Sequence, residues 1–401
     1  MATDALYSRK AAAVVALAVA GISLTSIPAM AHPGPAGTGS RRPASPGADV
    51  QVAAAPQVPE LPSGLSARSW MVADADTGAV LAAKAPHRRL PPASTLKTLF
   101  AVTVLPKFPA GSVRRVSAED LEGVGDGSSL VGVEQGERYR VADLWRGVFL
   151  RSGNDAVHVL ASMNGGWDAT AQEMQKTART LGARDTTVKS PDGYDTPGQL
   201  SSAYDLTVFG RAGLANPDFA RYCATARARF PTSDGLTPIE NTNRMLAGSH
   251  GLTPYPGIIG VKNGYTTHAG NTLVAAARRD GRTLLVTVMN PRSGEYNAVY
   301  KEAGSLLDWG FDSVGKARPI ETLRTVHTGS EGRTAIGPED RAVRRPPPTA
   351  AITAKADHGP SGNSATAVWG GGVGALVLAL AGTLAWCRHG RRRGGPPDGE
   401  A

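Results

Sequence analysis

Apolar residues in strand-like and helix-like patterns extend over one long stretch of the chain, from about residue 61 to residue 312. The segments on either side are dominated by Pro, Ala, Gly, Ser and Arg. Such segments bury too little apolar surface to offset the entropy of ordering them. The central stretch is long enough to enclose a core of its own. We therefore predict a single folded domain at residues 62–312.

Within this domain, strand patterns lie at both ends and helix patterns lie at the middle and the close. Alternating apolar residues predict strands, and apolar residues at helical spacing predict helices. The predicted strands are 70–74, 80–83, 271–277 and 283–289, and the predicted helices include 94–105 and 296–309. The first two strands flank a turn at 76–78 and form a hairpin. This order predicts an α/β fold of the α+β type, with one sheet built from both ends of the domain and a helical lobe.

The N-terminus has the parts of a secretory signal peptide. Arg9 and Lys10 precede an apolar run, and residues 29–31 supply the small residues of a cleavage site. We predict a signal peptide at 1–31, with an uncleaved anchor as the alternative. A disordered Pro/Ala-rich spacer is expected at 32–61.

The C-terminus predicts a membrane anchor. A disordered linker is expected at 313–365, followed by residues 366–387, which carry no formal charge and suffice to cross a bilayer as one helix. The tail, 388–401, begins with a cluster of arginines. Because positive residues stay on the cytoplasmic side, the domain should face the cell wall from a single-pass anchor in the cell membrane.

The charge distribution argues against nucleic-acid binding. The formal net charge is +9, and residues 313–401 alone hold 12 basic against 7 acidic residues. The basic excess therefore lies mainly in the tail, and no basic face is predicted on the domain. The two cysteines, Cys223 and Cys387, have neither disulfide nor metal-ligand spacing, and no metal or organic cofactor is predicted.

One serine motif opens a predicted helix. The chain contains no GxSxG elbow, no HExxH pattern and no phosphate-binding GxxxxGK loop. It does contain Ser94 and Lys97, which share one face of a helix because they are three residues apart. Near the helix N-terminus the macrodipole favours negative charge on Ser94. Lys97 can act as a base if burial or a neighbouring cation lowers its pKa.

Two further elements give this motif specificity. Ser152-Gly153-Asn154 follows an apolar run, and Lys262-Asn263-Gly264 precedes a predicted strand. Ser152 could relay a proton to a leaving amine, and Asn154 could bind a substrate amide. Lys262 could hold a substrate carboxylate and keep a neighbouring lysine neutral. The three elements in this order predict a serine acyl-transfer site.

The sequence resembles the serine penicillin-binding proteins and β-lactamases, and most closely the low-molecular-mass D-alanyl-D-alanine carboxypeptidases. Beyond the three motifs, the resemblance extends over several further segments between residues 66 and 311. These segments are 192–195 with 197–199, 241–243, 255–257 and 306–311. It implies the penicillin-binding transpeptidase-like fold, in which helices flank an antiparallel sheet beside an all-helical lobe.

The resemblance also implies a role for each matching position. Ser94 is expected to be the acylated nucleophile, Lys97 its base and Ser152 the proton relay. The expected substrate-binding residues are Asn154, Lys262, Asn263, Gly264 and Tyr265. The N–H groups of Ser94 and Tyr265 are expected to form an oxyanion hole. The expected reaction removes the terminal D-alanine from peptidoglycan stem pentapeptides. β-Lactams are expected as covalent inhibitors.

Two departures from the family pattern leave alternatives open. Asn263 stands where relatives have Thr or Ser, and Val299 stands where some relatives have a carboxylate-binding Arg. Arg292 and Lys301 are the candidate replacements for that Arg. A catalytically degenerate wall-binding scaffold is therefore one alternative. A β-lactamase is another, although the Glu-x-x-Leu-Asn pattern that would serve deacylation is absent between residues 154 and 262.

Overall fold

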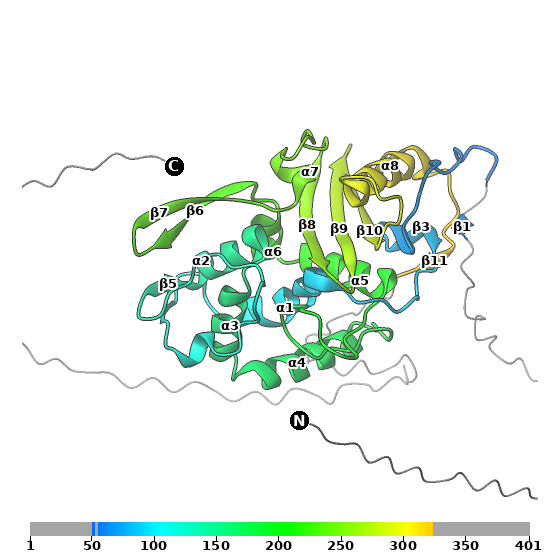
Figure 1. The fold of residues 1–401 in the computed structure, drawn as a ribbon. Helices are drawn as coiled ribbons and strands as arrows, with labels where there is room; N and C mark the ends of the chain where they lie inside the picture. The colour runs from blue at the N-terminus through cyan, green and yellow to red at the C-terminus, as the bar shows by residue number, and fades with distance from the viewer. Residues whose placement is uncertain (1–49, 53–54, 324–401) are drawn as a thin grey trace, which may run out of the picture. The chain divides into compact units, whose positions relative to one another are not determined.

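An antiparallel sheet forms the centre of the fold in the computed structural model, which describes residues 50–52 and 55–323 (Figure 1). Its strands are β1 (Val50–Val52), β2 (Ser69–Asp74), β3 (Ala79–Lys84), β8 (Ile258–Thr266), β9 (Gly270–Arg279), β10 (Arg282–Met289) and β11 (Glu321–Thr322). The strand order is β1-β3-β2-β10-β9-β8, and β11 also pairs with β3. The predicted hairpin and the late strands are thus confirmed, and one sheet does combine both ends of the domain.

Helices cover both faces of the sheet. Successive residues of β2 point to opposite faces, so Trp70 and Val72 pack against α8 (Ala298–Ser313), whereas Met71 and Ala73 join the core beneath α1 (Lys97–Val104) and α5 (Ala203–Leu214). Figure 1 shows α8 and α5 on opposite sides of the sheet. Strands buried on both faces are apolar throughout, which explains the short continuous runs in the sequence.

The remaining elements form a lobe next to the edge strand β8 (Figure 1). Its helices are α2 (Val141–Arg146), η4 (Gly147–Arg151), α3 (Asn154–Met163), α4 (Trp167–Thr180) and α6 (Pro217–Cys223). The expectation of an all-helical lobe was wrong in one respect, because β4 (Val113–Arg115) pairs with β5 (Arg138–Arg140). A hairpin of β6 (Arg227–Thr232) and β7 (Gly235–Glu240) then leads to the short helix α7 (Arg244–Ala247).

The ordered fold extends beyond the predicted boundaries at 62 and 312. Strand β1 lies within the predicted spacer 32–61, and β11 lies within the predicted linker 313–365, so for these parts the expectation of disorder was wrong. Both pair with β3, whose outer edge offers unpaired N–H and C=O groups that any extended segment can use. Leu323, which is 1% exposed, adds apolar burial behind β11.

The segments predicted to meet the membrane lie outside the described residues. These are the signal peptide at 1–31, the helix at 366–387 and the tail at 388–401. Within the described part of the chain, every helix is too short or too polar to span a bilayer.

Candidate active site

Ser94 sits in a tight turn that is fixed on the sheet. It belongs to η1 (Ala93–Leu96), a 3-10 turn that leads directly into α1. The Thr272 hydroxyl on β9 donates a hydrogen bond to the carbonyl of Pro92 at 2.9 Å. Ala93 takes a left-handed backbone conformation with φ of 50°, which is costly for a residue with a Cβ. The half-buried Ser94 side chain is therefore presented by a strained turn tied to the sheet.

Lys97 lies directly against Ser94. Its Nζ is 2.8 Å from Ser94 Oγ and donates to the backbone carbonyl of Asp192 at 2.7 Å. The side chain is only 1% exposed. Burial lowers the pKa of Lys97 to about 8, although the charges of Asp192 and Asp155 act in the opposite direction. The neutral amine, which can accept a proton, is therefore accessible near physiological pH.

Lys262 is a second buried cation on the strand side of the site. It lies on β8, is 1% exposed, and donates from Nζ to the carbonyl of Asn263 at 2.8 Å. Burial lowers the pKa of Lys262 well below its usual value, and the charge of Lys97 lowers it further. Two buried ammonium groups that repel each other cannot both hold their protons easily. This pairing favours a neutral lysine in the site.

Ser152 and Asn154 have unmet hydrogen-bonding capacity. Ser152 ends η4 in the left-handed region, with φ of 58°, and Asn154 begins α3. Both are buried, and within the described residues neither Ser152 Oγ nor Asn154 Oδ1 has a hydrogen-bond partner. Leaving buried polar atoms unpaired costs about 1–3 kcal/mol each. Such atoms are suited to a substrate that supplies the missing partners.

The edge strand β8 forms the opposite wall of the site. Its residues Asn263, Gly264 and Tyr265 follow Lys262, and Tyr265 is 67% exposed. A Cβ at Gly264 would lie 2.6 Å from Ser94 N and 2.8 Å from Thr272 Oγ1, so only glycine permits this approach. The outer N–H groups of an edge strand are not used by the sheet. The strand therefore brings free backbone donors beside Ser94.

A polar cavity of about 400 Å³ adjoins Gly264 at this wall. It is lined by Arg151, Glu240, Asn241, Thr242, Arg244, Ser249, His250, Asn263, Gly264, Tyr265, Asn271 and Tyr300. The Thr242 hydroxyl donates to Asn263 Oδ1 at 3.0 Å, which orients the Asn263 amide. Three of the expected site residues thus line one cavity.

Several residues that support the site were not assigned a role from the sequence. The Asp155 carboxylate accepts hydrogen bonds from the N–H groups of Val131, Gly132 and Val133, which fixes that loop beside Ser152. Gly193 passes so close to the turn that a Cβ there would lie 2.0 Å from the carbonyl of Ala93. Gly193 belongs to segment 192–195, and Asp155 directly follows the Ser152-Gly153-Asn154 motif, so the family resemblance was the only signal for them.

The two histidines near the motifs lie apart from this chemistry. His158 stacks on Trp167 with ring centroids 3.9 Å apart, and burial lowers its pKa. The ring of His268 is exposed and lies 3.5 Å from Asp195. Cys223 is buried, which raises its thiol pKa to about 12. Among the described residues, no three His, Cys, Asp or Glu side chains gather as metal ligands would.

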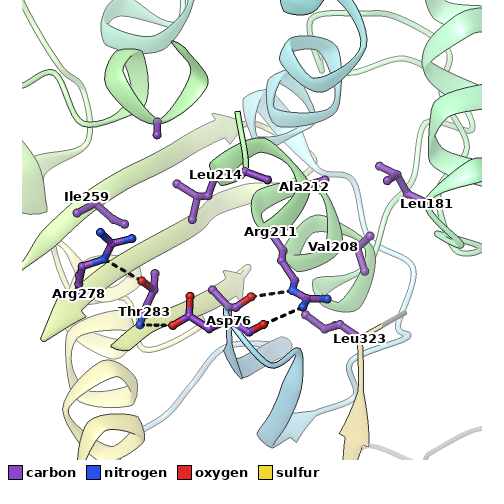
Figure 2. Close-up of a pocket in the computed structure, with 13 residues that line it drawn as sticks. Asp76, Leu181, Val208, Arg211, Ala212, Leu214, Ile259, Arg278, Thr283 and Leu323 are labelled. Carbon is purple, nitrogen blue, oxygen red and sulfur yellow. Dashed lines mark hydrogen bonds between the residues drawn. The ribbon is translucent and has the colours of Figure 1, made fainter. Parts of the chain in front are cut away.

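A second cavity of about 440 Å³ lies at the other end of β9 (Figure 2). Arg211 of α5 points into it and donates to the carbonyls of Ala75 and Asp76, at 2.7 Å and 3.2 Å. The Asp76 carboxylate accepts from the N–H of Thr283 at 3.1 Å, and Arg278 donates to the hydroxyl of Thr283 at 3.0 Å. Each of these charged groups already has a partner within the fold.

A serine beside a buried lysine, at the junction of an antiparallel sheet and a largely helical lobe, defines a class of acyl-transfer enzymes. Comparison with known proteins narrows this class to one family. The family model described as D-alanyl-D-alanine carboxypeptidase (peptidase S11) matches residues 53–293. This chain belongs to that family. It is 40% identical over 267 residues to the D-alanyl-D-alanine carboxypeptidase DacB2 of Mycobacterium tuberculosis, covering 66% of this chain and 87% of that protein.

Solved structures agree with this assignment. A crystal structure of a D-alanyl-D-alanine carboxypeptidase from M. tuberculosis superposes with a TM-score of 0.60 at 38% identity, covering 69% of this chain and all of that one. The Streptomyces K15 DD-transpeptidase superposes with a TM-score of 0.58 at 26% identity, covering 63% and 99% of the two chains. The chain therefore has the penicillin-binding, DD-peptidase fold.

Proposed function

We propose that this protein is a serine D-alanyl-D-alanine carboxypeptidase that removes the terminal D-alanine from peptidoglycan stem pentapeptides through an acyl-enzyme at Ser94. The observation that carries the proposal is the contact between Lys97 and Ser94. A lysine Nζ lies 2.8 Å from Ser94 Oγ, and its pKa is lowered to about 8 by burial. This is the arrangement that a serine needs to become a nucleophile at neutral pH.

Acylation then follows from the positions of the side chains. Neutral Lys97 takes the proton of Ser94 Oγ as the oxygen attacks the penultimate D-alanine carbonyl. The N–H groups of Ser94 and Tyr265 stabilise the oxyanion, a contribution of about 3–4 kcal/mol per donor in other enzymes. Protonated Lys97 returns its proton through Ser152 to the leaving amine, and the C–N bond breaks to release D-alanine and leave Lys97 neutral. Asn154 binds the substrate backbone through its amide.

Deacylation uses the same groups in reverse. Water attacks the ester carbonyl while Lys97 accepts its proton, and Lys97 then returns that proton to Ser94 Oγ, which leaves as the alcohol. Lys262, Asn263 and Gly264 border the space in which the terminal carboxylate of the substrate would lie. These residue types supply every proton transfer and charge contact in the cycle, so neither step draws on a metal or an organic cofactor.

The proposal places the enzyme on the outer face of the cell membrane. It is supported by the signal-peptide pattern at 1–31, the uncharged segment at 366–387 and the arginines of 388–401. A wall peptide ending in D-Ala-D-Ala would be within reach of a domain anchored in this way. We also propose that β-lactams acylate Ser94, because one of the family's solved structures, at 32% identity, is that of penicillin-binding protein 6B from Escherichia coli.

The alternatives are less well supported. A wall-binding scaffold requires no activated nucleophile, yet Ser94, Lys97 and Lys262 keep the geometry of one. A β-lactamase needs a carboxylate that activates water for deacylation. No carboxylate among the described residues hydrogen-bonds or ion-pairs with Ser94 or Lys97, and the contact that Asp192 makes with Lys97 comes from its backbone carbonyl.

The decisive experiment combines covalent labelling with product release. Wild-type protein and Ser94→Ala are incubated with a fluorescent penicillin and, separately, with an acylated peptide ending in D-Ala-D-Ala. We expect wild type to label and to release D-alanine, and Ser94→Ala to do neither while keeping its melting temperature. A folded wild-type protein that fails both assays would favour the scaffold. Penicillin hydrolysis faster than D-alanine release would favour the β-lactamase.

A further inference from the structure

The cavity beside Gly264 carries an excess of positive charge. Arg151 and Arg244 both line it, whereas its only carboxylate, Glu240, is paired with Arg227 at 3.0 Å. Buried Lys262 lies on the adjoining strand β8. A cavity with unpaired guanidinium groups and no free carboxylate favours an anionic ligand.

Arg244 is held in place without being neutralised. Its guanidinium donates to Asn297 Oδ1 and lies 4.9 Å from the ring centre of Tyr296 and 5.7 Å from that of Tyr300. No Asp or Glu in the described part of the chain forms an ion pair with it. Its contacts fix the orientation of the guanidinium at the start of α7, and the planar fork keeps donors for a carboxylate.

The positions considered from the sequence do not supply this cation. Val299 is 3% exposed and contributes to the core under α8. Lys301 is on the surface and pairs with Glu295 at 3.0 Å. Neither Arg292 nor Lys301 lines the cavity. Arg244 comes instead from the segment after β7, more than fifty positions earlier in the chain than Val299.

Asn263 connects Arg244 to the reacting groups. Thr242 donates to Asn263 Oδ1 at 3.0 Å, and the Tyr300 hydroxyl donates to the Thr242 carbonyl at 3.1 Å. The backbone carbonyl of Asn263 accepts from Lys262 at 2.8 Å. Because its acceptor oxygen is already used, the Asn263 side chain presents N–H donors rather than the hydroxyl of relatives. A carboxylate is the group that can accept a hydrogen bond from the Asn263 amide and form ion pairs with Arg244 and Lys262.

We propose that Arg244 binds the terminal carboxylate of the substrate and so selects peptides with a free C-terminus, taking over the role of the Arg that Val299 replaces. This inference rests on the proposed carboxypeptidase function. Arg244 orients the leaving D-alanine through its charge, and Asn263, fixed by Thr242, donates to the same carboxylate. The chemistry at Ser94 is unchanged.

The test compares two substrates on matched variants. One substrate is an acylated peptide ending in D-Ala-D-Ala, and the other is the same peptide with a C-terminal amide. For Arg244→Gln we expect kcat/KM on the acid to fall about 10- to 100-fold, with little change on the amide, because a charge-assisted hydrogen bond is lost only with the acid. The kcat/KM of Arg244→Lys on the acid should lie between the values for wild type and Arg244→Gln, since lysine keeps the charge but not the planar fork.

The controls separate this inference from the function on which it rests. Lys301→Gln, the neighbouring exposed cation, should leave both rates unchanged. Equal losses on acid and amide in Arg244→Gln, or a selective loss in Arg151→Gln instead, would overturn the role of Arg244. If Arg244→Gln does not fold, as judged by its thermal melt, Arg244→Lys gives the same comparison. Wild-type protein that releases no D-alanine would overturn the function itself.

Discussion

The two cavities described here have similar volumes but differ in how their charged side chains are held. At one end of β9, Arg211 donates to the carbonyls of Ala75 and Asp76, and the Asp76 carboxylate accepts from the N–H of Thr283 (Figure 2). At the other end, Arg244 has no carboxylate partner within the described residues. Ser152 Oγ, in the lobe beside this site, is buried and unpaired. Cavities of similar volume can therefore differ in how far their polar groups are paired, and two of the unpaired buried atoms, Ser152 Oγ and Asn154 Oδ1, belong to the predicted site motifs.

Left-handed backbone conformations occur at both ends of β9. Ala93 and Ser152 both hold left-handed conformations beside the reacting serine. Each costs roughly 1–3 kcal/mol, which the surrounding fold must offset. At the other end of β9, Asp280 in the turn to β10 is also left-handed. Because the reacting groups lie at the Ser94 end, substitutions there should reduce activity, whereas substitutions at the other end should mainly reduce stability.

The largest expected effect comes from Lys97→Met. Loss of the base should reduce D-alanine release at least a thousandfold. Stability at pH 7 should nevertheless stay equal or increase, because burial lowers the Lys97 pKa from 10.5 to about 8 in the folded state. That shift corresponds to a cost on the order of 3 kcal/mol for holding the proton. Single-turnover acylation and thermal melts at pH 7 measure both effects, and a clear loss of stability would contradict the assignment.

The pH dependence of the wild-type enzyme gives a second test of Lys97 as the base. Acylation requires neutral Lys97, so its rate should rise as the pH increases through about 8. Between pH 8 and 10.5 the unfolded chain holds this proton more tightly than the folded one. The contribution of Lys97 to stability therefore falls as pH drops through this window and is lowest below pH 8. An acylation rate that does not change across pH 8 would exclude Lys97 as the base.

A smaller effect is expected from Gly264→Ala. The new Cβ would lie 2.6 Å from Ser94 N, so β8 must move away from η1. Displacement of the oxyanion donors should lower kcat/KM about 10- to 100-fold and the free energy of unfolding by about 1–3 kcal/mol. Gly111→Ala is the matched control, since its Cβ would meet no atom within 4 Å. Unchanged acylation in Gly264→Ala would show that β8 does not supply these donors.

The smallest effect on activity is expected at the cavity lined by Arg211. Arg211→Gln loses its hydrogen bonds to Ala75 and Asp76, which should lower the free energy of unfolding by about 1–2 kcal/mol and the melting temperature by roughly 2–8 °C. The value of kcat/KM should change less than about twofold. The control Arg282→Gln replaces an exposed arginine on β10. It should change neither the free energy of unfolding nor kcat/KM appreciably. A large loss of activity in Arg211→Gln would refute the contrast between the two ends of β9.

Much of the fold could be predicted from local sequence. The hairpin of β2 and β3 and the strands β9 and β10 were evident because residues buried on both faces form short apolar runs bounded by turns. The weak strands β1 and β11 were not, because their pairing with β3 depends on a free sheet edge rather than on their own residues. The hairpin β4–β5 was missed because each strand has only three residues, too few for an alternating pattern to be recognised.

The sequence by itself determined the family, the order of the three motifs and the spacing that puts Ser94 and Lys97 on one helical face. These are local or comparative properties, and they are encoded in residue type and separation. Only the tertiary structure decided that Lys97 and Lys262 are buried together, that Gly264 touches the turn of Ser94, and that Arg244 faces the cavity in place of Val299. Burial, pKa and close approach depend on segments far apart in the chain, so no local pattern can specify them.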